Sequence, residues 1–127
     1  MDIKKMEQLE YFCSLKGTTE EKIVSAENAL GVTFSEEYRS YLKQYALASM
    51  NGHELTGIVD SKRLNVVDVT FKNRKINPDI SQDLYVVEEL HIDDVVVWQN
   101  ECGQIYQTIG ASKPVKIYDS FMEYIEE

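Results

Sequence analysis

Cysteine and histidine are the side chains best suited to nucleophilic catalysis, and the sequence contains two of each. Cys102 precedes Gly103 in a predicted turn, where its thiol would be accessible, and His91 could act as its base in a small hydrolase. The adjacent Glu101 argues against this chemistry, because a nearby anion disfavours the reactive thiolate. No residue that would orient the imidazole is evident, so the sequence favours an unreactive turn cysteine.

Metal and nucleotide sites need donors at fixed short spacings, which this sequence does not offer. Cys13, His53, His91 and Cys102 are scattered singly, without a CxxC or HExxH arrangement. His53-Glu54 is similar to the first half of a deaminase signature, but no paired cysteines follow it. The glycines never form GxGxxG or GxxxxGK. We therefore expect no metal ion and no cofactor, and we expect both cysteines to be reduced and unpaired, as isolated thiols, which are usually small buried hydrophobes, tend to be.

Carboxylates are the one abundant reactive group. The chain has 22 acidic and 13 basic residues, and its net charge is −9. Glu88-Glu89 and Asp93-Asp94 could be taken for the acid pair of a glycosidase, but neighbouring positions point to different sides and no apolar pocket is implied. Two interpretations remain open. These acids keep the protein soluble, or they form a negative surface that speeds association with a basic partner.

The same charge balance argues against direct binding to nucleic acid, which needs clustered cations. Lys72, Arg74 and Lys75 form the only basic cluster, and we interpret it as a solvated helix end. No run reaches the roughly 20 apolar residues that span a bilayer. Glu7 and Glu10 interrupt any signal-like apolar core at the N-terminus. We expect a cytoplasmic protein with no membrane contact.

Helical periodicity dominates the first third of the sequence. Apolar residues at helical spacing predict an amphipathic helix over residues 2–14. A capping box of Thr18 and Glu21 predicts a second helix that ends at Gly31. Ser35 should cap a third helix, whose aromatic stripe we interpret as core rather than as a binding site. The stripe consists of Tyr38, Tyr41, Leu42 and Tyr45.

After a turn at Asn51-Gly52 the pattern changes to strands. Strands are predicted over residues 54–59, 84–88, 95–98, 104–108 and 115–118. The first of them contains Gly57, which indicates a bulge or a close backbone contact. Ser120 and Glu123 form a capping box that opens a terminal helix.

Residues 64–75 fit a strand by propensity and a helix by periodicity. We favour a helix capped by Asn65, with Leu64, Val67 and Phe71 on its buried face. With that choice, helices come first, antiparallel strands follow and a helix closes the chain.

These elements predict an α+β fold in a single domain over residues 1–127. Its central, mainly antiparallel sheet should be flanked by the N-terminal helices and the C-terminal helix. With 127 residues, of which 43% are hydrophobic, the chain can bury a core without a disulfide or a structural metal.

Two segments carry a resemblance to a known family. Residues 29–38 read Ala-Leu-Gly-Val-Thr-Phe-Ser-Glu-Glu-Tyr, with Tyr41-Leu42 and Asn51-Gly52 after them, and residues 98–106 read Trp-Gln-Asn-Glu-Cys-Gly-Gln-Ile-Tyr. In order and spacing they resemble the SUKH superfamily, bacterial immunity-type proteins related to a fungal cell-wall synthesis regulator. The last segment, residues 120–125, is similar to the family's closing helix. Ser35 stands where the family often has proline, and Cys102 where a polar or acidic residue is common.

The resemblance implies a non-enzymatic immunity protein, an antitoxin that binds and neutralises a cognate protein toxin, often an RNase or DNase domain. A carboxylate-rich surface could occupy the cationic site of such a nuclease in place of nucleic acid. We expect a monomer or weak homodimer whose partner-facing acids lie on the sheet and its loops. These acids are Glu54, Asp60, Glu88, Glu89, Asp93, Asp94 and Glu101.

Two other functions stay open. The chain could be a regulatory scaffold for protein interactions in cell-wall signalling, like the fungal relatives, and a toxin gene beside its own would argue for immunity instead. It could also be a small cysteine hydrolase that uses Cys102, which thiol alkylation would test.

Overall fold

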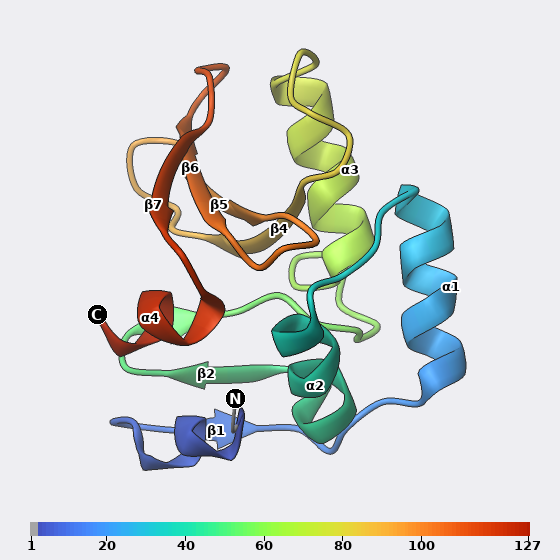
Figure 1. The fold of residues 1–127 in the computed structure, drawn as a ribbon, viewed down its shortest axis with the longest axis vertical. Helices are drawn as coiled ribbons and strands as arrows, with labels where there is room; N and C mark the ends of the chain where they lie inside the picture. Colours follow the sequence, from blue (N-terminus) through green and yellow to red (C-terminus); the bar gives the residue numbers. More distant parts are fainter. Residues whose placement is uncertain (1–2) are drawn as a thin grey trace.

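The computed structural model describes residues 3–127 as a four-stranded sheet, a smaller three-stranded sheet and the helices around them (Figure 1). The helices are the 3-10 helix η1 (Ile3–Gln8) and the α-helices α1 (Glu20–Leu30), α2 (Glu36–Tyr45), α3 (Val66–Ile76) and α4 (Phe121–Glu126). The strands are β1 (Cys13–Ser14), β2 (Ala48–Met50), β3 (His53–Glu54), β4 (Tyr85–Glu89), β5 (Val95–Gln99), β6 (Ile105–Ile109) and β7 (Val115–Tyr118). The predicted α+β class is confirmed.

Both sheets are antiparallel. The larger sheet has the order β4-β5-β6-β7 and the smaller one the order β1-β2-β3. An isolated bridge pairs Leu55 with Glu88, so the segment after β3 runs alongside β4. The central antiparallel sheet was predicted, whereas the smaller sheet was not.

The four-stranded sheet separates two apolar clusters. On one face α3 packs against the sheet, and Val69, Val86 and Trp98 belong to the smaller cluster. On the other face α2 and α4 contribute to the larger cluster, together with Val87 and Val97. Figure 1 shows α3 beside the sheet and α4 below it. Both faces of the β4–β5 hairpin are therefore packed against apolar clusters. This hairpin carries four of the seven expected partner-facing acids.

Capping residues fix the helix boundaries. Thr19, rather than the predicted Thr18, caps α1 by accepting a hydrogen bond from a backbone N–H in the first turn. Gly31 ends that helix with a left-handed φ of 69°. Ser35 and Ser120 cap α2 and α4 as predicted. The aromatic stripe of α2 is buried, which confirms its interpretation as core.

The predicted helix over residues 2–14 is wrong beyond Gln8, and its first residue lies outside the described residues. Tyr11 has a φ of 58°, and β1 then pairs with β2. Phe12 packs edge-on against Tyr45, with ring centroids 5.1 Å apart. Contacts with α2 and β2 thus override a helical pattern that is only local. As a result Cys13 is exposed, so the expectation that it is a buried thiol is wrong. Cys102 is also exposed, as expected for a cysteine in this turn.

The predicted strand over residues 54–59 is reduced to β3. After it the chain passes so close to the end of α2 that a Cβ at Gly57 would lie 1.9 Å from the carbonyl oxygen of Ala46. This confirms the close backbone contact expected at Gly57 and explains why no larger residue fits there.

The helical interpretation of residues 64–75 is confirmed by α3. The side-chain oxygen of Asn65 accepts a hydrogen bond from the N–H of Val67 at 2.9 Å, so Asn65 is the cap. The placement of Phe71 on the buried face is wrong, because its side chain is 43% exposed. The face around Thr70 is buried instead, since its hydroxyl accepts a hydrogen bond from the N–H of Val86 in the sheet.

Candidate partner-binding surface

Glu88 is a buried carboxylate, so the expectation that it is an exposed acid is wrong. Its side chain is only 3% exposed. Oε1 accepts hydrogen bonds from Nδ1 of His53, at 2.8 Å, and from the hydroxyl of Tyr124. Oε2 accepts one from the backbone N–H of Glu54, at 2.7 Å. Because the donors lie in β3 and α4, this carboxylate joins those elements to β4.

A β-bulge in β4 places Glu88 on the inside. Val86 pairs with Trp98, but Glu88 pairs with Val97, so Val87 is an extra residue in the strand. Because of this extra residue, Glu88 does not lie on the face that regular alternation along the strand would assign to it. Glu89 then faces α3. Sequence periodicity carries no sign of this insertion.

Burial around Glu88 also affects the neighbouring phenols. The pKa of Tyr124 is raised far above its ordinary value by burial and, to a smaller extent, by the charge of Glu88. Burial likewise raises the pKa of Tyr41, again with a smaller contribution from Glu88. Both hydroxyls therefore keep their protons at neutral pH, and Tyr124 remains a donor to the carboxylate.

Glu89 is held on the opposite face by α3. Its carboxylate oxygen Oε2 lies 2.8 Å from Nζ of Lys72 and accepts a hydrogen bond from the amide of Asn73 at 2.9 Å. Glu89 is thus an acid whose charge is compensated by a cation of the neighbouring helix.

Asp93 and Asp94 are exposed on the loop between β4 and β5. Neither carboxylate has a hydrogen bond or an ion pair to any residue from 3 to 127. Both residues, and His91 before them, have left-handed φ angles of 54°, 58° and 57° respectively. This loop therefore presents two uncompensated charges on an unusual backbone.

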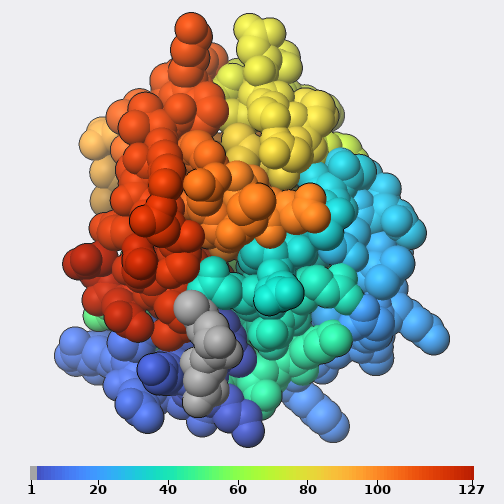
Figure 2. Space-filling model, viewed as in Figure 1, coloured from blue at the N-terminus to red at the C-terminus, as the bar shows by residue number. Residues whose placement is uncertain are grey.

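A groove of about 450 Å³ brings Glu89, Asp93 and Asp94 together. We call it the α3 groove. Its lining residues are Lys72, Asn73, Ile76, Glu89, His91, Asp93, Asp94, Val95, Val96 and Gly110. Figure 2 shows a notch at the top of the molecule between the β6–β7 turn, in orange-red, and the end of α3, in yellow.

Glu54 and Asp60 line no part of the α3 groove. Glu54 forms an ion pair with Arg63, with 2.8 Å between the charged groups. The hydrogen bond from Arg63 holds the pKa of Glu54 below its ordinary value. Asp60 is exposed in the segment that leads to α3.

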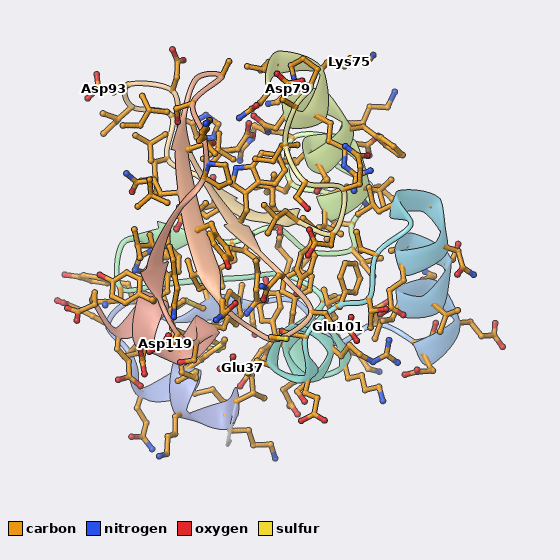
Figure 3. The ribbon with its side chains drawn as sticks, turned by 45° about the horizontal axis from the view of Figure 1, so that its top comes forward. Glu37, Lys75, Asp79, Asp93, Glu101 and Asp119 are labelled. Carbon is orange, nitrogen blue, oxygen red and sulfur yellow. The ribbon has the colours of Figure 1, made fainter. Side chains whose placement is uncertain are left out.

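Glu101 lies in the turn between β5 and β6, beside a second groove of about 660 Å³. We call this the link groove, since residues 33–35 between α1 and α2 line it together with Glu36, Glu37 and Arg39 of α2 and residues 101–103. Figure 3 labels Glu37 and Glu101 there. Cys102 is in the same turn, whereas His91 precedes β5 at the other end of the strand. The fold does not bring this thiol and imidazole together.

Comparison with known proteins identifies the family. The family model described as SUKH_5, SMI1-KNR4 cell-wall, matches residues 2–127. The chain belongs to this SUKH family. No curated protein matches the sequence.

The two segments that carry the SUKH resemblance pack against each other in the link groove. The hydroxyl of Ser35 donates to Oε1 of Gln99 at 3.0 Å, and the amide of Gln99 donates to the carbonyl oxygen of Gly103 at 3.0 Å. The hydroxyl of Tyr85 joins them through a 2.8 Å hydrogen bond to Gln99. These residues are buried, so the motif serves mainly to fix the hairpin against α2.

Sequence reasoning missed Lys72, Asn73 and Ile76 as neighbours of the acidic loop. Their spacing places them on one side of a helix, but only the packing of α3 shows which side meets β4. Within residues 3–127 no helix is long and apolar enough to cross a membrane, and no three acidic, histidine or cysteine side chains cluster as metal ligands would.

Proposed function

We propose that this SUKH chain is a non-enzymatic immunity protein that binds and neutralises a cognate protein toxin, in particular a nuclease domain. The observation that carries the proposal is the family match over residues 2–127. It is supported by the surplus of acids, because a nuclease site is lined with cations that hold phosphate and can be blocked by carboxylates.

The proposed partner-facing surface keeps the acids other than Glu88, although Glu89, whose side chain is 11% exposed, contributes only from within the α3 groove. The remaining residues are Glu54, Asp60, Glu89, Asp93, Asp94 and Glu101. A negative surface raises the rate of encounter with a cationic partner by about 10- to 1,000-fold, and salt weakens this effect. The protein acts in the cytoplasm as a monomer or weak homodimer.

A growth-rescue experiment tests the proposal. A toxin domain encoded beside the gene is expressed with and without the chain, and the two purified proteins are mixed. We expect the cells to survive only with the chain, a stable complex to form, and the association rate to fall steeply with salt. A toxin that stays fully active in excess chain, with no complex formed, would count against the proposal.

The alternative is a regulatory scaffold in cell-wall signalling, which the wording of the family description favours. Deleting the gene should then alter sensitivity to cell-wall inhibitors in cells that hold no toxin. An immunity protein predicts no such change.

A further inference from the structure

The α3 groove combines an apolar wall with an acidic rim. Ile76 from α3 and Val95 and Val96 from β5 line it, and the side chain of Ile76 is 53% exposed. The rim carries Asp93 and Asp94 on the β4–β5 loop. A ligand that fits this groove must therefore offer hydrocarbon and positive charge together.

The charges of the groove do not cancel. Lys72 is its only lysine or arginine, and it is already paired with Glu89. The carboxylates of Asp93 and Asp94 have no hydrogen-bond or ion-pair partner among residues 3–127. Figure 3 shows Asp93 at one side of the molecule's upper end, with Lys75 and Asp79 at the other side.

The backbone of the loop is a turn that suits its residues. His91, Asp93 and Asp94 have positive φ angles, and aspartate and histidine adopt this region several-fold more often than most other non-glycine residues. The loop therefore presents both carboxylates in a conformation that these residue types tolerate.

We infer that the α3 groove binds an arginine side chain of the partner protein. The guanidinium group meets the carboxylates of Asp93 and Asp94, and the aliphatic stem lies along Ile76. Arginine fits better than lysine, because its planar group donates several hydrogen bonds at once and is less strongly hydrated. This inference rests on the proposed function and specifies the partner's chemistry at one place.

Charge also favours an arginine side chain over two other occupants of the groove, nucleic acid and a second copy of the chain. Nucleic acid would bring phosphates toward unpaired carboxylates, which repel them. A second copy placed symmetrically on the same groove would set acids against acids, since the groove's only lysine is committed to Glu89.

The probe for the inference is Nα-acetyl-arginine amide, titrated into the isotope-labelled chain and followed by amide NMR shifts. We expect shifts confined to residues 72–76, 89–96 and 110. The uncharged analogue Nα-acetyl-citrulline amide should give none, and the lysine analogue should give smaller ones. Shifts spread evenly over all exposed acids, or equal shifts with citrulline, would overturn the inference.

Two matched variants sharpen the result. Asp93→Asn with Asp94→Asn removes the two charges while keeping residues that tolerate positive φ, so the fold should be preserved. Affinity for the arginine probe should fall by about tenfold, the equivalent of 1.4 kcal/mol. The control, Glu10→Gln with Glu126→Gln, removes two exposed charges outside the groove and should bind the probe like the unchanged chain.

The same variants separate this inference from the proposed function. If the unchanged chain rescues cells from the toxin and the Asp93/Asp94 variant rescues them equally, the groove inference fails and the immunity proposal stands. If the arginine probe binds in the groove but no toxin of the locus is neutralised, the immunity proposal fails.

Discussion

The β4–β5 hairpin carries two kinds of carboxylate, one buried and hydrogen-bonded and the other exposed and unpaired. Glu88, at the strand end, is buried and accepts hydrogen bonds from His53, Tyr124 and the backbone of Glu54. Asp93 and Asp94, in the loop, are exposed, and their carboxylates have no partner among residues 3–127. One group of acids is used to hold the fold together, and the other is left available at the surface.

The difference shows how far charge alone can identify a functional residue. A buried carboxylate is retained only where donors compensate for the lost water, so Glu88 is explained by its neighbours. The carboxylates of the loop acids form no hydrogen bond or ion pair within residues 3–127, and the one bond of Asp94 is made by its backbone carbonyl oxygen, which accepts from Gly110. An acidic residue whose carboxylate forms no bond within the fold is therefore the better candidate for contact with a binding partner.

Alkaline pH should produce the largest loss of stability, because it acts on the buried tyrosines, including Tyr124 beside Glu88. Burial raises the pKa of Tyr38, Tyr41, Tyr85 and Tyr124 in the folded protein, whereas unfolded tyrosine ionises near pH 10. The folded state thus keeps protons that the unfolded state releases, and stability present below about pH 10 is lost as the pH rises above it. Each such group contributes a loss that approaches about 1.4 kcal/mol per pH unit once the pH is well above 10.

Urea unfolding at pH 8, 10 and 11, followed by circular dichroism, measures this loss. Tyrosinate absorbance should rise together with the loss of structure. The expectation fails if all eight tyrosines of the chain ionise while the circular dichroism spectrum remains that of the folded protein.

Glu88→Ala should produce the next largest effect, a loss of about 3 to 5 kcal/mol in the free energy of unfolding. The variant leaves the imidazole of His53 and the hydroxyl of Tyr124 buried without their acceptor. Glu89→Ala on the adjacent residue is the comparison variant, and it should cost less, about 1 to 2 kcal/mol, because it breaks an ion pair with a half-exposed lysine and removes one hydrogen bond from the amide of Asn73. Equal losses for the two variants would contradict the special role given to the donors around Glu88.

Much of the fold was predictable because local signals and tertiary packing agree. Ser35, Asn65 and Ser120 cap the helices that the sequence assigns to them. The strands β4 to β7 lie within one or two residues of their predicted positions. The N-terminal segment was mispredicted, because its helical pattern is weaker than its pairing with β2.

The candidate site was only partly predictable, and the β-bulge at Val87 explains why. Alternation along a strand assigns each side chain to a face, but an inserted residue reverses the assignment after it. Sequence reasoning therefore grouped Glu88 with the exposed acids. Sequence reasoning also could not predict that Asp93 and Ile76 line the same groove, because this depends on how α3 packs across the sheet.

The smallest expected effect concerns the backbone of the loop, where the smaller of two substituted residues should give the more stable protein. Asp93→Gly and Asp93→Ala both remove the carboxylate, but only glycine adopts the φ of 54° without steric cost. The glycine variant should be more stable than the alanine variant by about 1 kcal/mol, measured by urea unfolding. Both variants should bind the arginine probe equally weakly, because each lacks the same charge. If alanine were as stable as glycine, the backbone at Asp93 would hold no strain, and the loop would owe its shape to other contacts.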